Sequence, residues 1–353
     1  MIVKNEEKNL LKCLDSIHDL VEEINIVDTG STDKTIEIAK KYTDRIFFFE
    51  WINDFSAARN YSFSKATKEY ILWLDADDVI YEEDRIKLKE LKQTLNPEVD
   101  IIYTDYICSK DENGNPLLTI SKERIVRRSK NYQWKNKVHE MMELSGKYAF
   151  VDFKIHHEPF EAKDSFTRNE KIIIETMKDN TATVREIGYH IQFLYVSKEY
   201  DEAIECFEKY EKEYSGNDYF NISVYLSVHM AYLEKMDYEK AYLVLAKNDS
   251  ILNTFAEYHC LLGDFSFNVL KDFDTAIKYY KRALNCKKGI STGIKVIALD
   301  DYYYFYPYKA MGVCYWEQGK HKDAVVALKK ALEYKDDDSV KRALEKAIMI
   351  SEN

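Results

Sequence analysis

The N-terminal half of the chain is organised around one segment, Ile71-Leu72-Trp73-Leu74-Asp75-Ala76-Asp77-Asp78. In it an apolar run of strand length passes directly into three carboxylates within four positions. Such crowding of negative charge is unfavourable unless a cation neutralises it. Carboxylate oxygens suit Mg²⁺ or Mn²⁺, and such an ion can hold a diphosphate leaving group. Taken alone, the acidic triplet is equally compatible with a solvated turn that caps a helix before Ile80.

Apolar segments of strand length alternate with amphipathic segments on both sides of this stretch, up to about residue 160. We predict strands over 23–27, 45–49 and 70–74, and helices over 33–42 and 56–66. This alternation is typical of an α/β domain with a Rossmann-like, mainly parallel sheet. Ligands of such sheets bind at the carboxyl ends of the strands, so the residues directly after each strand are the first candidates for chemistry.

The second half of the chain is predicted to be all-α, because helical periodicity replaces the strand pattern from about residue 182. Four similar helices begin near Ala203, Ala241, Ala276 and Ala324, at spacings of 38, 35 and 48 residues. A period near 34 residues is typical of tetratricopeptide hairpins, in which small residues let paired helices pack closely. The last unit resembles that family best, through Gly312, Tyr315, Gly319, Ala324 and Ala331.

We therefore predict three parts: a nucleotide-sugar-binding catalytic domain over 1–165, a linker over 166–181, and tetratricopeptide-like repeats over 182–353.

Composition and charge restrict the classes of partner. The chain has 46% hydrophobic and 32% charged residues, as folded globular proteins do. Its net charge of −11 argues against binding to nucleic acid or to an anionic membrane. The sequence has neither an apolar run of membrane-spanning length nor a signal-peptide pattern, so we expect a cytoplasmic protein without a membrane anchor. Its six cysteines form no C-x-x-C pair and are expected to be free thiols.

Two further motifs follow predicted strands. The segment 28–33, Asp-Thr-Gly-Ser-Thr-Asp, places a carboxylate where a ribose or uracil could bind, with a helix start directly after it. An N-cap role for Ser31 or Thr32 is compatible with this interpretation. At the N-terminus, 2–7 (Ile-Val-Lys-Asn-Glu-Glu) predicts a strand end that passes into a helix. We therefore expect Asn5 and Glu6 beside the Asp28 loop.

Four motifs occur in a fixed order along the first 78 residues: 3–7 (Val-Lys-Asn-Glu-Glu), 27–33 (Val-Asp-Thr-Gly-Ser-Thr-Asp), 54–60 (Asp-Phe-Ser-Ala-Ala-Arg-Asn) and 74–78 (Leu-Asp-Ala-Asp-Asp). Together they resemble the family 2 nucleotide-sugar glycosyltransferases with the A-type fold, and the resemblance reaches at least to His157. With its helical second half, the chain is similar to soluble bacterial transferases that glycosylate bacteriocin peptides. Met1 directly precedes Ile2, where relatives usually carry several more apolar residues, so we expect a short first strand.

The resemblance implies roles for individual residues. The residues expected at the nucleotide or the donor sugar are Val3, Asn5, Glu6, Asp28, Arg59, Asp75 and Ala76. Of these, Asp28 would contact the uridine, Arg59 would lie near the diphosphate, and Asp75 would approach the ribose or sugar. Asp78 stands where relatives often have Glu, which keeps the charge and shortens the reach.

The resemblance also implies a metal site for Mn²⁺ or Mg²⁺. Asp77 would be the metal ligand, and a histidine at the end of a later strand would complete the metal shell. His157 is favoured over His156 because it is nearer the strand exit. For either histidine, packing at the strand end is the alternative.

A catalytic base is expected in the segment 134–140 (Trp-Lys-Asn-Lys-Val-His-Glu), which is similar to a family segment that ends in Val-His-Glu. In an inverting transfer the acceptor hydroxyl or thiol must lose its proton, and a carboxylate or an imidazole is the natural base. The candidates are Glu140 and His139. An ordinary ion-paired role for Glu140 is the alternative.

The function that the resemblance implies is inverting, metal-dependent transfer of a sugar from a UDP-sugar to a Ser, Thr or Cys side chain of a peptide or protein. The helical array would bind the acceptor or form a homodimer. One alternative is transfer to a surface-polysaccharide or lipid-linked precursor. Another is an inactive binding scaffold, against which the retained Asp75, Asp77, Arg59 and His157 argue.

Overall fold

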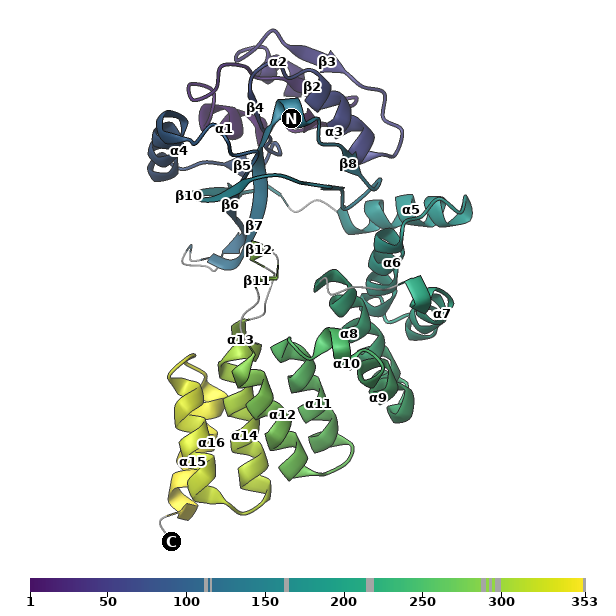
Figure 1. Cartoon of the computed structure of the whole chain (residues 1–353), viewed down its shortest axis with the longest axis vertical. Helices are drawn as coiled ribbons and strands as arrows, with labels where there is room; N and C mark the ends of the chain where they lie inside the picture. Colours follow the sequence, from purple (N-terminus) through teal and green to yellow (C-terminus); the bar gives the residue numbers. More distant parts are fainter. Residues whose placement is uncertain are drawn as a thin grey trace. The chain divides into compact units, whose positions relative to one another are not determined.

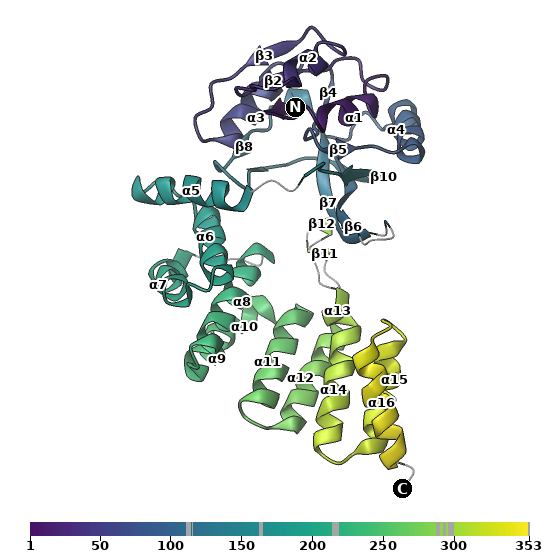
Figure 2. The same cartoon turned by 180° about the vertical axis from the view of Figure 1, so that it is seen from behind.

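The computed structural model describes all residues except 111–113, 115, 162–164, 214–218, 287–289, 292–293, 296–299 and 352–353. The chain forms two compact units, Met1–Glu186 and Ile187–Asn353. The first unit combines strands and helices, and the second is mainly helical (Figure 1, Figure 2). The predicted α/β domain followed by a helical array is therefore confirmed.

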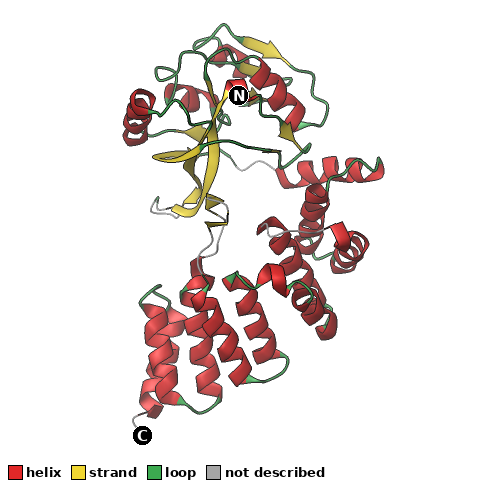
Figure 3. Ribbon diagram, in the orientation of Figure 1, coloured by secondary structure: helices red, strands yellow, loops and turns green. Residues whose placement is uncertain are grey.

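The first unit contains two sheets (Figure 3). A three-stranded parallel sheet has the order β1-β2-β3, formed by Ile2–Val3, Ile26–Asp28 and Ile46–Phe48. A five-stranded sheet has the order β4-β7-β6-β10-β5, formed by Tyr70–Leu72, Pro116–Arg127, Ile101–Lys110, Tyr148–His157 and Asp78–Val79. Because β7 runs antiparallel to both its neighbours, the five-stranded sheet is mixed.

Helices and a short hairpin complete this unit. The helices in its first half are α1 (Leu10–Asp15), α2 (Thr35–Ala39), α3 (Phe55–Ser64) and α4 (Glu82–Thr94). The hairpin pairs β8 (Trp134–Lys135) with β9 (Met141–Met142), and it follows the 3-10 turn Arg128–Lys130. The predicted strands and helices are thus present, but shorter than expected, because ladder pairing covers only part of each apolar run.

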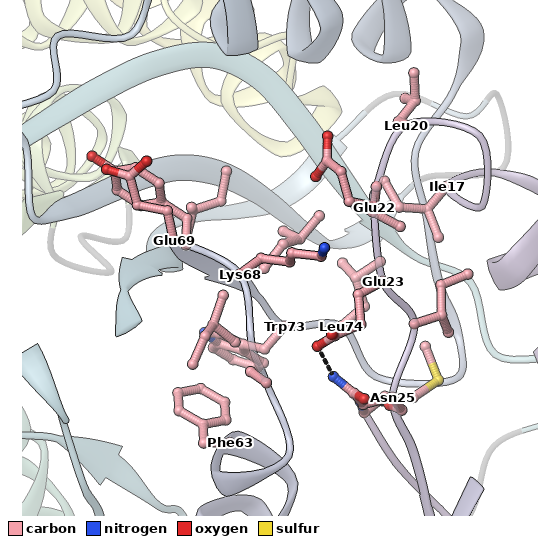
Figure 4. Close-up of a pocket in the computed structure, with 18 of the residues that line it drawn as sticks. Ile17, Leu20, Glu22, Glu23, Asn25, Phe63, Lys68, Glu69, Trp73 and Leu74 are labelled. Carbon is pink, nitrogen blue, oxygen red and sulfur yellow. Dashed lines mark hydrogen bonds between the residues drawn. The ribbon is translucent and has the colours of Figure 1, made fainter. Parts of the chain in front are cut away.

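A cavity of about 530 Å³ lies between the edges of β1 and β4, which do not pair with each other (Figure 4). Its lining is mainly apolar, with Leu20, Phe63 and Leu74 among the residues around it. It contains none of the acidic residues 75, 77 and 78. The three acidic residues therefore lie outside this cavity, although Arg59 and Trp73 are among its lining residues.

The stretch 166–181, expected to be a linker, is mostly helix. Helix α5 (Ser165–Lys178) buries Ile172 and Ile173 and belongs to the first unit. The division between the units falls after Glu186, whose carboxylate accepts a hydrogen bond of 2.8 Å from the Lys137 amide. The segment is rich in charged residues, as linkers often are. Its apolar pair nevertheless lies on one face of a helix and is buried.

The second unit is built from antiparallel helices. They are α6 (Val184–Val196), α7 (Tyr200–Tyr210), α8 (Tyr219–Glu234), α9 (Tyr238–Ala246), α10 (Asp249–Leu252), α11 (Ala256–Asn268), α12 (Phe273–Asn285), α13 (Asp300–Tyr303), α14 (Phe305–Glu317), α15 (His321–Leu332) and α16 (Asp338–Ser351). The 3-10 turn Glu211–Glu213 and the strands β11 (Ile290–Ser291) and β12 (Ile294–Lys295) interrupt the series. In the described part of the chain no helix has both the length and the apolar character that a membrane crossing requires.

Small residues set the spacing between paired helices, as the repeat pattern predicted. The four alanines at 203, 241, 276 and 324 are fully buried. Gly263 on α11 faces the ring of Tyr280 on α12, and a Cβ atom at Gly263 would lie 2.5 Å from Tyr280 Cε1. The ring cannot easily retreat, because its hydroxyl donates a hydrogen bond of 2.7 Å to Asp264. Close approach of these helices therefore requires glycine at this position.

Gly263→Ala is expected to destabilise the second unit by about 1–3 kcal/mol, because overpacking outweighs the gain in helix propensity. Chemical denaturation of the parent and the variant measures this difference. In a Tyr280→Leu background the same substitution should cost clearly less, since the clashing ring is absent. Equal costs in the two backgrounds would contradict the packing argument.

Candidate active site

Asp78 is the structural centre of the acidic segment. It is fully buried, and its carboxylate accepts hydrogen bonds of 2.9 Å from Arg124 Nη1 and from the Tyr106 hydroxyl. It also accepts a bond of 2.8 Å from the amide of Asp75, while its own amide donates to the Asp75 carbonyl. Asp78 therefore closes the turn 75–78, and its oxygens are already engaged by the protein.

Arg124 reaches Asp78 because of a β-bulge in β7. Ile125 pairs with Ile102 and Glu123 pairs with Tyr103, which leaves Arg124 as the extra residue between them. Such a bulge bends the strand and redirects a side chain. The guanidinium group lies between the rings of Trp73 and Tyr106, at 4.0 and 4.2 Å from their centroids. The bulge thus delivers a fully buried cation to a fully buried carboxylate.

Asp77 and His157 face each other at the ends of neighbouring strands. The antiparallel pairing of β5 with β10 aligns Asp78 with His157, and His157 Nδ1 lies 3.6 Å from Asp77 Oδ1. Burial raises the pKa of Asp77 to about 6, and the charges of Asp75 and Asp78 act in the same direction. Desolvation and like charge thus disfavour a bare carboxylate at this position.

The residues present fit a divalent cation. One ligand atom from each of Asp77, Asp78 and His157 lies within 4.8 Å of the others. His157 Nδ1 is buried and has no hydrogen-bond partner among the described residues. A buried imidazole nitrogen and a disfavoured carboxylate are the ligand types that Mn²⁺ accepts, and Mg²⁺ prefers the oxygens. Asp77 and His157 would hold the ion, since Asp78 is engaged by Arg124.

His156 points to the opposite face of β10, as adjacent strand residues do. Its Nε2 lies 3.4 Å from Asp84 Oδ2, and its ring packs against Tyr81 at 4.4 Å between centroids. The structure therefore places His157, not His156, at the acidic turn. A cavity of about 440 Å³ opens beside Asp77 and His157 and is also lined by Lys8 and Lys12.

The Asp28 loop and the N-terminal motif lie side by side, as expected. The Asp28 carboxylate accepts bonds of 3.2 Å from the Gly30 amide and 3.1 Å from the Ser31 amide. Asn5 Oδ1 accepts a bond of 2.8 Å from the Thr32 amide, and the Glu6 amide donates to the hydroxyl of Thr35. These contacts hold Asn5 and Glu6 against the loop at the carboxyl ends of β1 and β2.

The structure refines one expectation for this region and contradicts another. The side chains of Val3 and Ala76 are buried in one hydrophobic cluster, so only their main chain can contact a ligand. Neither Ser31 nor Thr32 caps α2, so that interpretation is wrong. Asp33 occupies the turn instead, and its carboxylate accepts a bond of 2.9 Å from the Thr35 amide.

Arg59 connects two acidic residues that lie far apart in the sequence. Helix α3 begins where Asp54 accepts a hydrogen bond from the Ala57 amide, and it carries Arg59. Arg59 Nη2 lies 2.8 Å from Asp75, and Arg59 Nε lies 2.6 Å from Glu140. The guanidinium also lies near the rings of Trp73 and Trp134, at 5.0 and 5.1 Å. The positive charge of Arg59 is therefore already paired with two carboxylates when no diphosphate is bound.

The two candidate bases differ in their surroundings. Glu140 is held by Arg59, as described above. His139 has a left-handed backbone, with φ 51°, which is uncommon for a residue other than glycine. Burial lowers the pKa of His139 to about 4, and the cations Arg185, Lys122 and Arg168 add to that effect. The imidazole is therefore neutral near pH 7, as a general base must be.

Sequence reasoning missed two cations on β7, Lys122 and Arg124, that act on the acidic segment. Although burial opposes it, three nearby cations hold the carboxyl pKa of Asp75 well below its usual range. They are Arg59, Arg124 and Lys122. The one signal in the sequence was the pair Lys122 and Arg124 ahead of the apolar residues of β7, and only the bulge shows where Arg124 points.

Arg124→Met is expected to destabilise the first unit by about 3–5 kcal/mol, because it leaves the Asp78 carboxylate buried without its cation. Thermal and chemical unfolding measure this loss. Lys147→Met is the matched control, since Lys147 forms an exposed pair with Glu98 and should matter by less than about 1 kcal/mol. Equal effects of the two substitutions would refute a central role for the buried pair.

Residues 1–160 match the family model described as Glycosyl transferase family 2. The chain is 29% identical over 221 residues to the SPbeta prophage-derived glycosyltransferase SunS of Bacillus subtilis, a match that covers 59% of this chain and 51% of that protein. It is 31% identical over 145 residues to a TPR repeat-containing protein of Synechococcus elongatus, covering 41% of this chain and 35% of that one. The chain thus spans about half or less of the length of these relatives.

Solved structures with similar helical arrangements include the crystal structure of MamA, at 18% identity and a TM-score of 0.39, covering 48% of this chain and 88% of that one. Another is YrrB, titled a TPR protein with an unusual peptide-binding site, at 15% identity and a TM-score of 0.39, covering 52% of this chain and 84% of that one. The family model agrees with the resemblance seen in the motifs: residues 1–160 of this chain are similar to glycosyl transferase family 2.

Proposed function

We propose that this chain transfers a sugar, with inversion, from a UDP-sugar to a Ser, Thr or Cys side chain of a peptide or protein. The observation that carries the proposal is the pair of Asp77 and His157 at the strand ends, with a buried imidazole nitrogen that has no hydrogen-bond partner among the described residues. Mn²⁺ or Mg²⁺ bound there would offset the charge that develops on a diphosphate leaving group.

The nucleotide would bind across the carboxyl ends of β1 and β2. Asp28 lies there with its carboxylate already oriented by two main-chain amides, and Asn5 and Glu6 flank it. A carboxylate in this position can accept hydrogen bonds from a ribose or a uracil. Asp75 is kept ionised by its cations, so it can accept hydrogen bonds from hydroxyl groups of the ribose or the sugar.

His139 is our candidate for the base that takes the acceptor proton, and Glu140 is assigned to positioning Arg59. This division follows from the ion pair of 2.6 Å that engages Glu140, and from the burial that keeps His139 neutral. A base of low pKa is available over the whole physiological range, although its driving force for proton transfer is modest.

The acceptor class is supported by two findings. SunS, to which the chain is similar, is named a glycosyltransferase, and the second unit of this chain consists of helical hairpins. Stacked hairpins offer extended surfaces on which a peptide or a second copy of the chain can bind. We therefore propose a peptide or protein acceptor, with the hairpins used for acceptor docking or for a homodimer.

Titration of the full chain with UDP is expected to give metal-dependent binding. Asp77→Asn should weaken binding in the presence of Mn²⁺ by on the order of tenfold or more, because it removes an ionic metal ligand. Calorimetry with and without Mn²⁺ measures this. Asp152→Asn is the matched control, since Asp152 is an exposed carboxylate on the same strand as His157. UDP binding that ignores both Mn²⁺ and the Asp77 substitution would contradict the metal assignment, and no UDP binding by the parent chain would contradict the donor class.

The transfer rate is expected to be nearly constant from about pH 6 to pH 8. With Asp77 held ionised by saturating Mn²⁺, the rate should fall as His139 becomes protonated near its pKa of about 4, because the protonated imidazole cannot accept the acceptor proton. His139→Gln should lower kcat by about 10²- to 10⁴-fold. The exposed His18 provides the control, and His18→Gln should leave the rate unchanged. Full activity of His139→Gln across this range, with loss in Glu140→Gln, would reverse the assignment of the base.

A further inference from the structure

Among the described residues Lys122 forms no direct ion pair, although the charges of Glu123 and Asp75 lie near it. It lies on β7 beside the end of β4, and its ammonium group is 5.1 Å from the centroid of the Trp73 ring. Among the described residues, no carboxylate oxygen lies within 4.0 Å of that group. Burial, and after it the charge of Arg124, lowers the pKa of Lys122. An ammonium group in such a position is costly unless an anion joins it.

The other two cations beside Asp75 are already paired. Arg59 contacts both Asp75 and Glu140, and Arg124 is bound to Asp78. Asp75, Asp78 and Glu140 are therefore engaged by arginines, whereas Lys122 has no direct carboxylate partner among the described residues. A negative group that enters the site meets Lys122 without first displacing an ion pair.

Hydrogen-bond donors are in excess around Trp73, which supports the same conclusion. Trp134 is buried, its ring lies 4.9 Å from that of Trp73, and its indole nitrogen has no partner among the described residues. Nitrogens Nε and Nη2 of Arg124 also have no hydrogen-bond partner in the described part of the chain. These enclosed nitrogens do not contact a ligand themselves, but their unbalanced donors add positive potential beside Lys122.

The anion that Lys122 would bind is distinct from the diphosphate that a metal ion at Asp77 and His157 would hold. Lys122 pairs with Thr104 on β6, and β6 separates β7 from β10, which carries His157. Two strand spacings amount to roughly 10 Å. Lys122 and Arg59 instead lie over the same ring, that of Trp73, at 5.1 and 5.0 Å from its centroid, and Arg59 contacts Asp75 and Glu140, the neighbour of His139. Lys122 therefore lies at the end of the site where transfer to the acceptor takes place.

We propose that Lys122 is a specificity-determining residue that binds a carboxylate of a substrate at the transfer end of the site. The carboxylate is either that of a uronic acid in the donor or that of an acidic side chain beside the acceptor atom. Both sources present the same chemistry to the ammonium group. This inference rests on the proposed function, because the transfer end is defined by Asp75 and His139.

The test uses the full chain with Mn²⁺ and compares the parent, Lys122→Gln and the control Lys147→Gln, which removes an equal charge from an exposed pair. One arm measures the binding of UDP-glucuronic acid and UDP-glucose by calorimetry. The other arm measures transfer to Ser- and Cys-containing peptides that carry Glu, and to matched peptides that carry Gln. A charge-assisted hydrogen bond corresponds to a preference of about ten- to hundredfold for the charged partner.

A preference for UDP-glucuronic acid that Lys122→Gln abolishes identifies the donor as the source. A preference for Glu peptides that Lys122→Gln abolishes identifies the acceptor. Thermal unfolding should show Lys122→Gln to be as stable as the parent or more so, since no ion pair is broken. Equal weakening of both donors, or no change in either preference, overturns the proposal. If the parent binds neither donor, the proposed function itself fails, and this result is distinct from a loss of preference.

Discussion

The ion pair between Asp78 and Arg124 is the interaction on which the geometry of the site depends. Both side chains are fully buried, and the pair connects the turn after β4 to the bulge in β7. A buried charge without its partner costs several kcal/mol, so the turn and the bulge are stable only together. Tyr106 and the amide of Asp75 complete the shell of the carboxylate. The buried pair thereby fixes the directions in which the side chains of Asp75 and Asp77 extend from the turn.

This arrangement divides the three carboxylates of one short segment by role. Asp78 is paired with Arg124, Asp75 is held ionised by nearby cations, and burial raises the pKa of both Asp77 and Asp78. Environments that push the pKa values of neighbouring groups apart are typical of functional sites. The pairing of β5 with β10 then brings His157 to the one carboxylate that lacks an internal cation.

Two separate sheets contribute to the site, and helix α1 and the turn after it help to hold them in place. The thiol of Cys13 lies 3.4 Å from the Asp75 carbonyl, and the hydroxyl of Ser16 accepts a bond of 3.2 Å from the Ile80 amide. These contacts link the nucleotide loops on β1 and β2 to the acidic turn after β4. They matter because β1 and β4 do not pair, and a cavity of about 530 Å³ lies between their edges.

The sequence by itself determined the class of each half, because apolar periodicity is a local property. It showed a strand before residues 75–78, the neighbouring loops of Asn5 and Asp28, and the buried alanines of the helical hairpins. It did not show the helix over 165–178, the mixed sheet, or Arg124 beneath the acidic turn. Those depend on pairing between segments about 50 residues apart, such as Trp73 with Arg124. Only the tertiary structure decided which carboxylate is paired with a buried arginine and which histidine faces the site, since burial and charge balance arise from contacts that are distant in the sequence.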